Sequence, residues 1–230
     1  MLLQILTYTH HLTTMLFGIF LSAFFLGVKQ NKKNVCILLS GAAVSGLFFL
    51  ICNTVFGSLF TEAVYPIFVH LPLFLLLVFY YRFRWLPSII SIMTAYLCCQ
   101  FSNWAGIFAL SLSGLEWVYY LVRIIVTVAV FAFLSRYLCQ TTALLFAKSD
   151  RELYILGAMP FVYYVFDYST TKYSMLLYSG NKVVVEFLAF AMCISYVIFL
   201  FVYFQEYELK NRAEQYGQLT NMQLNSLHSE

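Results

Sequence analysis

Charged and polar side chains inside long apolar stretches are the residues of this chain whose types and positions could support chemistry. Arg123, Glu186 and His70 each lie within a stretch of roughly twenty mainly apolar residues. Such side chains are costly in lipid, so they pair with one another or mark the path of a polar ligand or ion. We therefore expect recognition chemistry at these positions.

The motifs of common enzyme classes are absent from the sequence. There is no Gly-rich phosphate loop, no HExxH zinc motif and no Ser-His-Asp set at one depth. His10 and His11 are adjacent, so they diverge on a helix, and we interpret both as interfacial residues rather than metal ligands. The six cysteines lie in or beside apolar segments without a CxxC pair, which is typical of small core residues. We expect no metal and no cofactor in this chain.

The composition is that of an integral membrane protein. Hydrophobic residues make up 62% of the chain and charged residues 10%, and the mean hydropathy is +0.82. A soluble globular domain does not reach these values. Because backbone polar groups in lipid must be satisfied internally, and because the apolar stretches are longer than barrel strands, the stretches predict helices. The predicted fold class is all-α, a multi-pass helix bundle with the lipid bilayer as a partner and no nucleic-acid partner.

Seven membrane spans are predicted from the apolar stretches. They cover roughly residues 5–28, 35–56, 64–81, 86–110, 117–134, 153–168 and 183–204. Pro72 and Pro160 should bend the third and sixth spans. The uncharged fourth span is long enough to tilt or to break near Ser102 to Gly106. Leu138 to Arg151 contains a segment too short to cross, which predicts a short helix along the membrane surface.

The distribution of basic residues predicts the orientation of these spans. Alternating loops place ten of the thirteen Lys and Arg residues on one side and two on the other, with Arg123 inside a span. By the positive-inside rule, the side with ten is cytoplasmic. The N-terminus is then outside the cell, and the C-terminal segment is cytosolic. We divide the chain into a transmembrane domain, 1–204, and a cytosolic helix, 205–230.

Six residues are candidates for ligand binding because of their predicted depth. His70 and Arg123 lie about six residues, or about 9 Å, inside the outer ends of their spans, and Glu186 lies about one turn inside. The candidates are His70, Asn103, Trp104, Arg123, Asp167 and Glu186. One interpretation is a water-accessible, aromatic-lined pocket for an extracellular ligand, which suits a peptide or another amphipathic molecule. The other is that Arg123 and Glu186 pair or snorkel and only hold the bundle together.

The last predicted span continues into a charged helix without a flexible joint. Val183 to Phe204 contains no Gly or Pro, and the following segment contains no Pro and one glycine, Gly217. Movement of the span should therefore be passed into the cytosol. Leu209, Ala213, Tyr216 and Leu227 follow a weak heptad seam, so we predict a homodimer through this helix. The alternative is a solvated helical tail.

Two stretches carry a resemblance to a known family. Residues 81–106 read YRFRWLPSIISIMTAYLCCQFSNWAG, and residues 203–224 read YFQEYELKNRAEQYGQLTNMQL. Together with the spans between them, they resemble the membrane sensor region of bacterial receptor histidine kinases with a GHKL-type ATPase module, including peptide-sensing quorum receptors of the accessory-gene-regulator kind. The resemblance covers essentially the whole chain and rests on the order of the spans and on their general residue composition. It implies a bacterial cell membrane, an extracellular signal and a response regulator downstream.

The chain departs from that family at the phosphoacceptor. The family motif reads Arg-His-Asp, whereas His228 stands in Leu-His-Ser-Glu, and we assign it no role. About 26 residues follow the last span, fewer than an ATP-binding domain requires. We expect no phosphoacceptor and no catalytic domain within these residues. ATP, Mg²⁺ and a response regulator would bind only to a transmitter domain outside them.

The interpretation that we carry forward is a sensor module of a two-component histidine kinase, with a sensor domain at 1–204 and a signalling helix at 205–230. The alternative is a small-solute transporter or a substrate-binding membrane subunit, which broken helices at Pro72 and Pro160 would suit. A membrane peptidase is a third class. It needs a nucleophile beside a base, and His70 and Cys98 lie at different predicted depths.

Overall fold

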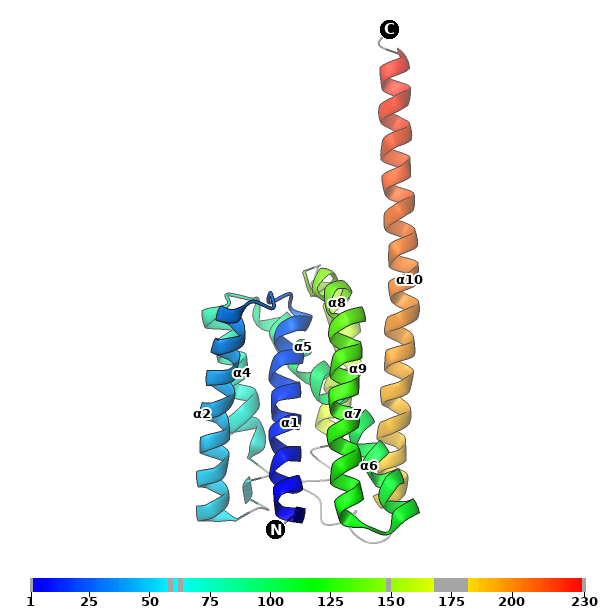
Figure 1. Ribbon diagram of the computed structural model, residues 1–230. Coiled ribbons are helices and arrows are strands. Elements are labelled where there is room, and N and C mark those ends of the chain that lie inside the picture. Colours follow the sequence, from blue (N-terminus) through cyan, green and yellow to red (C-terminus); the bar gives the residue numbers. More distant parts are fainter. Residues whose placement is uncertain (1, 58–59, 62–63, 148–149, 168–181, 229–230) are drawn as a thin grey trace. The chain divides into compact units, whose positions relative to one another are not determined.

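The computed structural model describes residues 2–57, 60–61, 64–147, 150–167 and 182–228, without the side chains of 151–152, 182–189 and 224–228. These residues form helices joined by short turns, with no strand among them, so the all-α prediction is confirmed for the described chain. In order, the elements are α1 (Leu2–Phe25), α2 (Lys32–Phe56), η1 (Pro66–His70), α4 (Leu71–Leu75), η2 (Leu76–Tyr80), α5 (Trp85–Cys98), α6 (Gln100–Ser113), α7 (Glu116–Tyr137), α8 (Cys139–Phe146), α9 (Asp150–Asp167) and α10 (Lys182–His228) (Figure 1).

Within the described part of the chain, four helices are long and apolar enough to cross a membrane, as expected of a membrane protein. They are Lys32–Phe56, Trp85–Ser113, Glu116–Tyr137 and Phe190–Gln223. The apolar helices Pro66–Tyr80 and Leu153–Asp167 are shorter. α1 is not among the four because polar side chains, including His10 and His11, lower its hydropathy. The other three predicted spans stay predictions.

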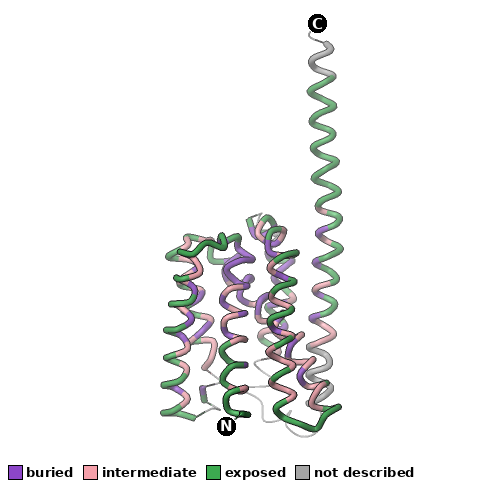
Figure 2. Tube along the Cα trace, in the orientation of Figure 1, coloured by how far each residue is buried: buried purple, intermediate pink, exposed green. Residues whose placement is uncertain are grey.

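The chain forms two compact units, Met1–Cys193 and Ile194–Glu230. In the first unit, α5 is the central helix, and it packs against both α1 and α9. Ten of its fourteen residues are buried. Few residues of α2 and α7 are buried, and their exposed residues are largely apolar, as expected for helices that face lipid (Figure 2).

A hydroxyl of the central helix joins α5 to α1. The Ser91 hydroxyl donates a hydrogen bond to the Ser22 carbonyl over 2.5 Å, and Ser22 donates to the Gly18 carbonyl over 2.6 Å within α1. Small polar residues at such contacts let two helices approach closely while every donor keeps an acceptor.

Several basic residues lie at one end of the first unit. The turn between α1 and α2 carries Lys29, the turn before α5 carries Arg82 and Arg84, and the last turn of α7 carries Arg136. These three segments lie at the same end of the unit as α8, which is the short helix predicted between the fifth and sixth spans (Figure 1). The membrane orientation itself stays a prediction.

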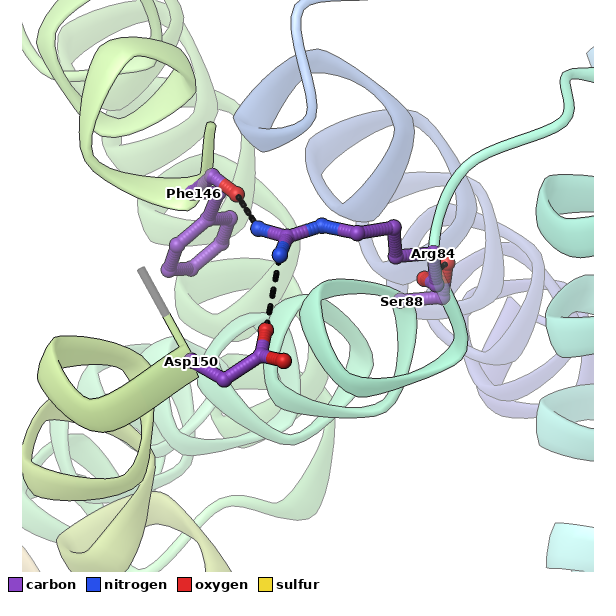
Figure 3. Close-up of polar contacts among 4 residues, drawn as sticks. All are labelled: Arg84, Ser88, Phe146 and Asp150. Carbon is purple, nitrogen blue, oxygen red and sulfur yellow. Dashed lines mark hydrogen bonds and ion pairs between the residues drawn. The ribbon is translucent and has the colours of Figure 1, made fainter. Parts of the chain in front are cut away.

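Arg84 connects three helices at this end (Figure 3). Its Nη1 lies 2.7 Å from Asp150 Oδ1 at the start of α9, and its Nη2 donates to the Phe146 carbonyl at the end of α8 over 3.4 Å. Its own carbonyl accepts from the Ser88 hydroxyl over 2.8 Å in the first turn of α5. Both charged side chains are about half exposed, so the pair contributes at most about 1 kcal/mol to stability. Its main effect is to fix these helix ends relative to one another.

The helix that contains Pro72 is irregular. η1 and η2 are π-helical turns on either side of α4, and the Leu71 N–H bonds to the Pro66 carbonyl five residues earlier. A proline removes one backbone donor from the helix, and π turns are a common response to such a disruption. The sequence predicted a bend here, and the structure shows a change of helix type.

The helix break in the predicted fourth span lies at Cys99 and not between Ser102 and Gly106, so that prediction was wrong in position. The Ser102 hydroxyl donates to the Cys99 carbonyl over 2.8 Å. The helical bond from the Asn103 N–H to the same carbonyl is 3.4 Å long. A side chain that competes for a helical carbonyl weakens the helix locally, so the interruption follows Cys98.

Close packing between α5 and α9 depends on Gly157. A Cβ at this position would lie 2.6 Å from two carbons of Ile90. We expect Gly157→Ala to lower the free energy of unfolding by about 1–3 kcal/mol, because overpacking forces a shift of Ile90 or of the helices. The measurement is the thermal unfolding midpoint of the purified protein in micelles.

The control for Gly157→Ala is Gly18→Ala in α1, where a Cβ would meet nothing within 4 Å. Alanine is the better helix former by about 1 kcal/mol at both positions. The difference between the two variants therefore isolates the contact with Ile90. Equal midpoints would contradict the close approach of α5 and α9.

Candidate functional site

His70 lies in a polar and aromatic cluster that joins three helices. Its Nδ1 hydrogen-bonds the Tyr164 hydroxyl of α9 over 2.8 Å. Its ring lies 5.3 Å from that of Tyr65 and 5.8 Å from that of Tyr96 in α5, measured between centroids. The Tyr96 hydroxyl donates to the Asp167 carboxylate. These five residues, which we call the His70 cluster, bring together two of the six predicted site residues, His70 and Asp167.

The positions of these side chains follow from the local backbone. His70 is the last residue of π-helical η1, and π turns change the direction in which the following side chains point. Tyr96 lies three residues before the break at Cys99, so both face the same side of α5. The two helix irregularities therefore meet at the same cluster.

A cavity of about 100 Å³ lies beside the His70 cluster. Tyr65, His70 and Tyr96 line it on one side. Thr14, Gly18 and Ser22, spaced four apart on α1, line it on the other. A water molecule occupies about 30 Å³ of liquid, so the space suits about three waters or one small polar group.

Arg123 forms a second cluster, between α1, α6 and α7. Its Nη1 donates to the Tyr119 hydroxyl over 2.5 Å, and its guanidinium carbon lies 5.1 Å from the centre of the Tyr119 ring. The buried His10 ring lies near this charge and 5.9 Å from the Tyr120 ring. We call Arg123, Tyr119, Tyr120, His10 and Gly106 the Arg123 cluster.

His10 is buried between helices, which the sequence did not predict, whereas its depth relative to the membrane surface stays a prediction. Its exposed fraction is 4%. The reason is that α1 packs closely against α7, so one face of α1 is covered even near its N-terminus. His10 also shares a 3.3 Å hydrogen bond with the Thr14 hydroxyl one turn later.

Gly106 allows α6 to cover Arg123. A Cβ at Gly106 would lie 2.4 Å from Arg123 Cγ and 2.8 Å from Cδ. Any other residue would displace the arginine side chain. Gly106, where the sequence predicted a helix break, instead lies inside α6 and packs against Arg123.

The other predicted site residues lie apart from these clusters or outside the described side chains. Asn103 Nδ2 contacts Gln100 Oε1 within α6 at 3.4 Å. The Trp104 ring lies 5.1 Å from the Phe190 ring. Glu186 belongs to α10, but its side chain lies outside the described residues. Of the six candidates, His70 lines the cavity.

The arrangement supports binding through hydrogen bonds, aromatic surfaces and one cation. Among the described residues, no group of three or more His, Cys, Asp or Glu side chains could hold a metal ion. Burial raises the pKa of the Cys139 thiol in α8 to about 12, so this thiol stays protonated at neutral pH and is a poor nucleophile.

Sequence reasoning missed Tyr65, Tyr96 and the α1 residues of the cavity. One signal was present, because Thr14, Gly18 and Ser22 are small or polar residues at a spacing of four inside an apolar helix. No comparable signal distinguishes Tyr96 from the other seventeen tyrosines.

Comparisons of the chain with protein family models, with curated proteins and with solved structures found no match.

The hydrogen bond between His70 and Tyr164 should stabilise the bundle. We expect Tyr164→Phe to lower the free energy of unfolding by about 1–3 kcal/mol, because His70 Nδ1 loses its 2.8 Å partner in a buried environment. Thermal unfolding in micelles measures the effect. Tyr154→Phe, on an exposed part of the same helix, is the matched control and should change stability by less than about 0.5 kcal/mol. Equal stability of the two variants would show that this bond is not formed.

Proposed function

We propose that this chain is the membrane sensor module of a two-component histidine kinase, which detects an extracellular ligand and signals through α10. The observation that carries the proposal is the continuity of α10, a single helix of 47 residues. At about 1.5 Å per residue, it is about 70 Å long, against about 30 Å for the hydrocarbon core of a bilayer. More than half of its length must then extend beyond the hydrocarbon.

The sequence of α10 explains why the helix does not stop at the membrane surface. It contains no proline, and its one glycine, Gly217, lies far beyond the apolar part. Glu208 and Arg212 form an ion pair of 3.4 Å at the i, i+4 spacing that favours a helix in water. A continuous helix transmits a rotation or a displacement that a flexible linker would absorb.

The proposed topology has seven spans, with the N-terminus outside the cell and the C-terminus in the cytosol. Its support is the bias in basic residues and the common end of the segments that carry Lys29, Arg84 and Arg136. The predicted seventh span forms the first part of α10, so the polar C-terminal part of α10 then lies in the cytosol. There a second copy would pair with it to form a homodimer.

Signalling requires that the ligand binds one arrangement of the bundle more tightly than another. Moving a two-state equilibrium from 1:99 to 99:1 takes about 5.5 kcal/mol of differential binding. The π turns beside His70 and the break at Cys99 are places where the helices can change arrangement at low cost. Because both border the cavity, a ligand there acts on both.

Stiffness of α10 is the first property to test. In a chimaera, residues 1–230 are fused to the catalytic region of a GHKL-type histidine kinase. The stimulus is conditioned medium from the organism that carries the gene. The measured response is the change in autophosphorylation of the chimaera. Seven Gly and Ser residues inserted after Phe204 should abolish the change, because they uncouple the two parts of the helix. Seven alanines inserted at the same place keep the heptad register and should preserve it. Equal responses of the two insertions would refute transmission through α10.

The proposed ligand site is tested with Arg123→Leu and Glu186→Leu in the same chimaera. Each should abolish the response while the protein stays in the membrane, because each removes a polar group that the outer pocket would use. Arg136→Leu, at the other end of α7, is the control and should respond normally. A normal response from both pocket variants would remove the pocket hypothesis.

A small-solute transporter is the second candidate, and the interrupted helices favour it. Transporter sites often form where helices are broken, and His70 and Cys99 both lie at an interruption and line the cavity. In that case, vesicles containing the protein would take up a solute, and the α10 insertions would leave uptake unchanged. Uptake together with an unresponsive chimaera would support the transporter.

A further inference from the structure

Arg123 carries a positive charge that the described side chains do not neutralise. It lies seven residues into α7, about 10 Å along the helix. Among the side chains that the structure describes, no carboxylate oxygen lies within 4.0 Å of its guanidinium. Its Nε is buried and has no hydrogen-bond partner in that part of the chain. An enclosed N–H without an acceptor is costly, so among the described side chains this site lacks an acceptor.

Snorkelling alone does not explain this arrangement. A snorkelling arginine places its head in water, where all five N–H donors find acceptors. Here Nη1 bonds to Tyr119, while Nε is enclosed without an acceptor. Because Gly106 has no side chain, α6 packs directly over Cγ and Cδ of Arg123 and restricts the movement of this side chain.

The surroundings of Arg123 suit an amphipathic partner. Tyr119 and Tyr120 provide aromatic surface, with ring centroids 5.0 Å apart. The cavity lies beside this cluster on α1, because Thr14, which lines the cavity, shares a 3.3 Å hydrogen bond with His10. The buried His10 has a hydrogen bond to Thr14 and offers no negative charge.

We propose that Arg123 binds the oxyanion of an amphipathic molecule, a carboxylate or a phosphate, that enters from the predicted outer leaflet. This inference rests on the proposed function and names the chemical class of its ligand. With Nη1 held by Tyr119, the Nε–Nη2 edge is the one left for two parallel hydrogen bonds to an oxyanion. Since Nε is enclosed in this conformation, binding requires a shift of α6 or of the side chain, and that shift couples the ligand to the bundle.

The test uses a matched pair of probes, N-dodecanoylglycine and its amide, which differ only in the negative charge. The whole protein is placed in nanodiscs of phosphatidylcholine, and its thermal unfolding midpoint is measured against probe concentration. Hydrogen bonds to charged groups are strong, so the acid should reach half of its effect at a concentration on the order of ten- to a hundredfold lower than the amide.

Three variants show whether Arg123 is responsible. Arg123→Gln removes the charge and should abolish the difference between acid and amide. Arg123→Lys keeps the charge and should retain part of the difference, so it tests the proposal if the glutamine variant does not fold. Arg136→Gln is the control and should behave as the unaltered protein does, because Arg136 is exposed at the other end of α7.

A second arm identifies the source of the oxyanion. If phosphatidylglycerol in the nanodiscs raises the midpoint through Arg123 and removes the effect of the acid, the bound group is a lipid phosphate. If it does not, the bound group is the carboxylate of a separate ligand. The proposal is overturned if acid and amide act alike, or if Arg123→Gln keeps their difference. Because no signalling is measured, failure of the receptor proposal leaves this result unaffected.

Discussion

The cost of an unsatisfied polar group in an apolar environment is the constraint on which the structure depends. It explains why every long apolar stretch in the described chain is a helix, since a helix satisfies its own backbone. It also explains why several polar side chains in the interior have hydrogen-bond partners. Ser91 reaches the Ser22 carbonyl, His70 reaches Tyr164, and the Arg123 guanidinium reaches Tyr119. The first two contacts join separate helices, whereas the third joins two successive turns of α7.

One of these contacts, that of His70, lies where a helix is irregular. π turns inside α-helices are rare and are frequently found at functional sites. His70 follows such a turn, and Cys99 lies at a break. The cavity lies between them and is bordered by both. A molecule that enters it would therefore contact irregular positions of two helices at once.

The helical class, the approximate helix ends and the presence of a short helix before α9 were predictable, because hydrophobicity and length determine them. The pairing of side chains was not. Asp167 was predicted at the outer end of its span, but its partner Tyr96 is one tyrosine of eighteen. The break at Cys99 depends on one hydroxyl, that of Ser102, whose hydrogen bond leaves no pattern in the sequence. The burial of His10 depends on how tightly α1 packs against α7, which hydropathy does not report.

The account as a whole requires that α10 continues without a joint from lipid into water. A spin-label scan from Ile198 to Arg212 in reconstituted membranes measures this most directly, since side-chain mobility and accessibility are recorded at each position. We predict low backbone mobility throughout and an unbroken helical period of about 3.6 residues in accessibility across Phe204 and Gln205. A run of mobile positions there, or loss of the period, would contradict the account.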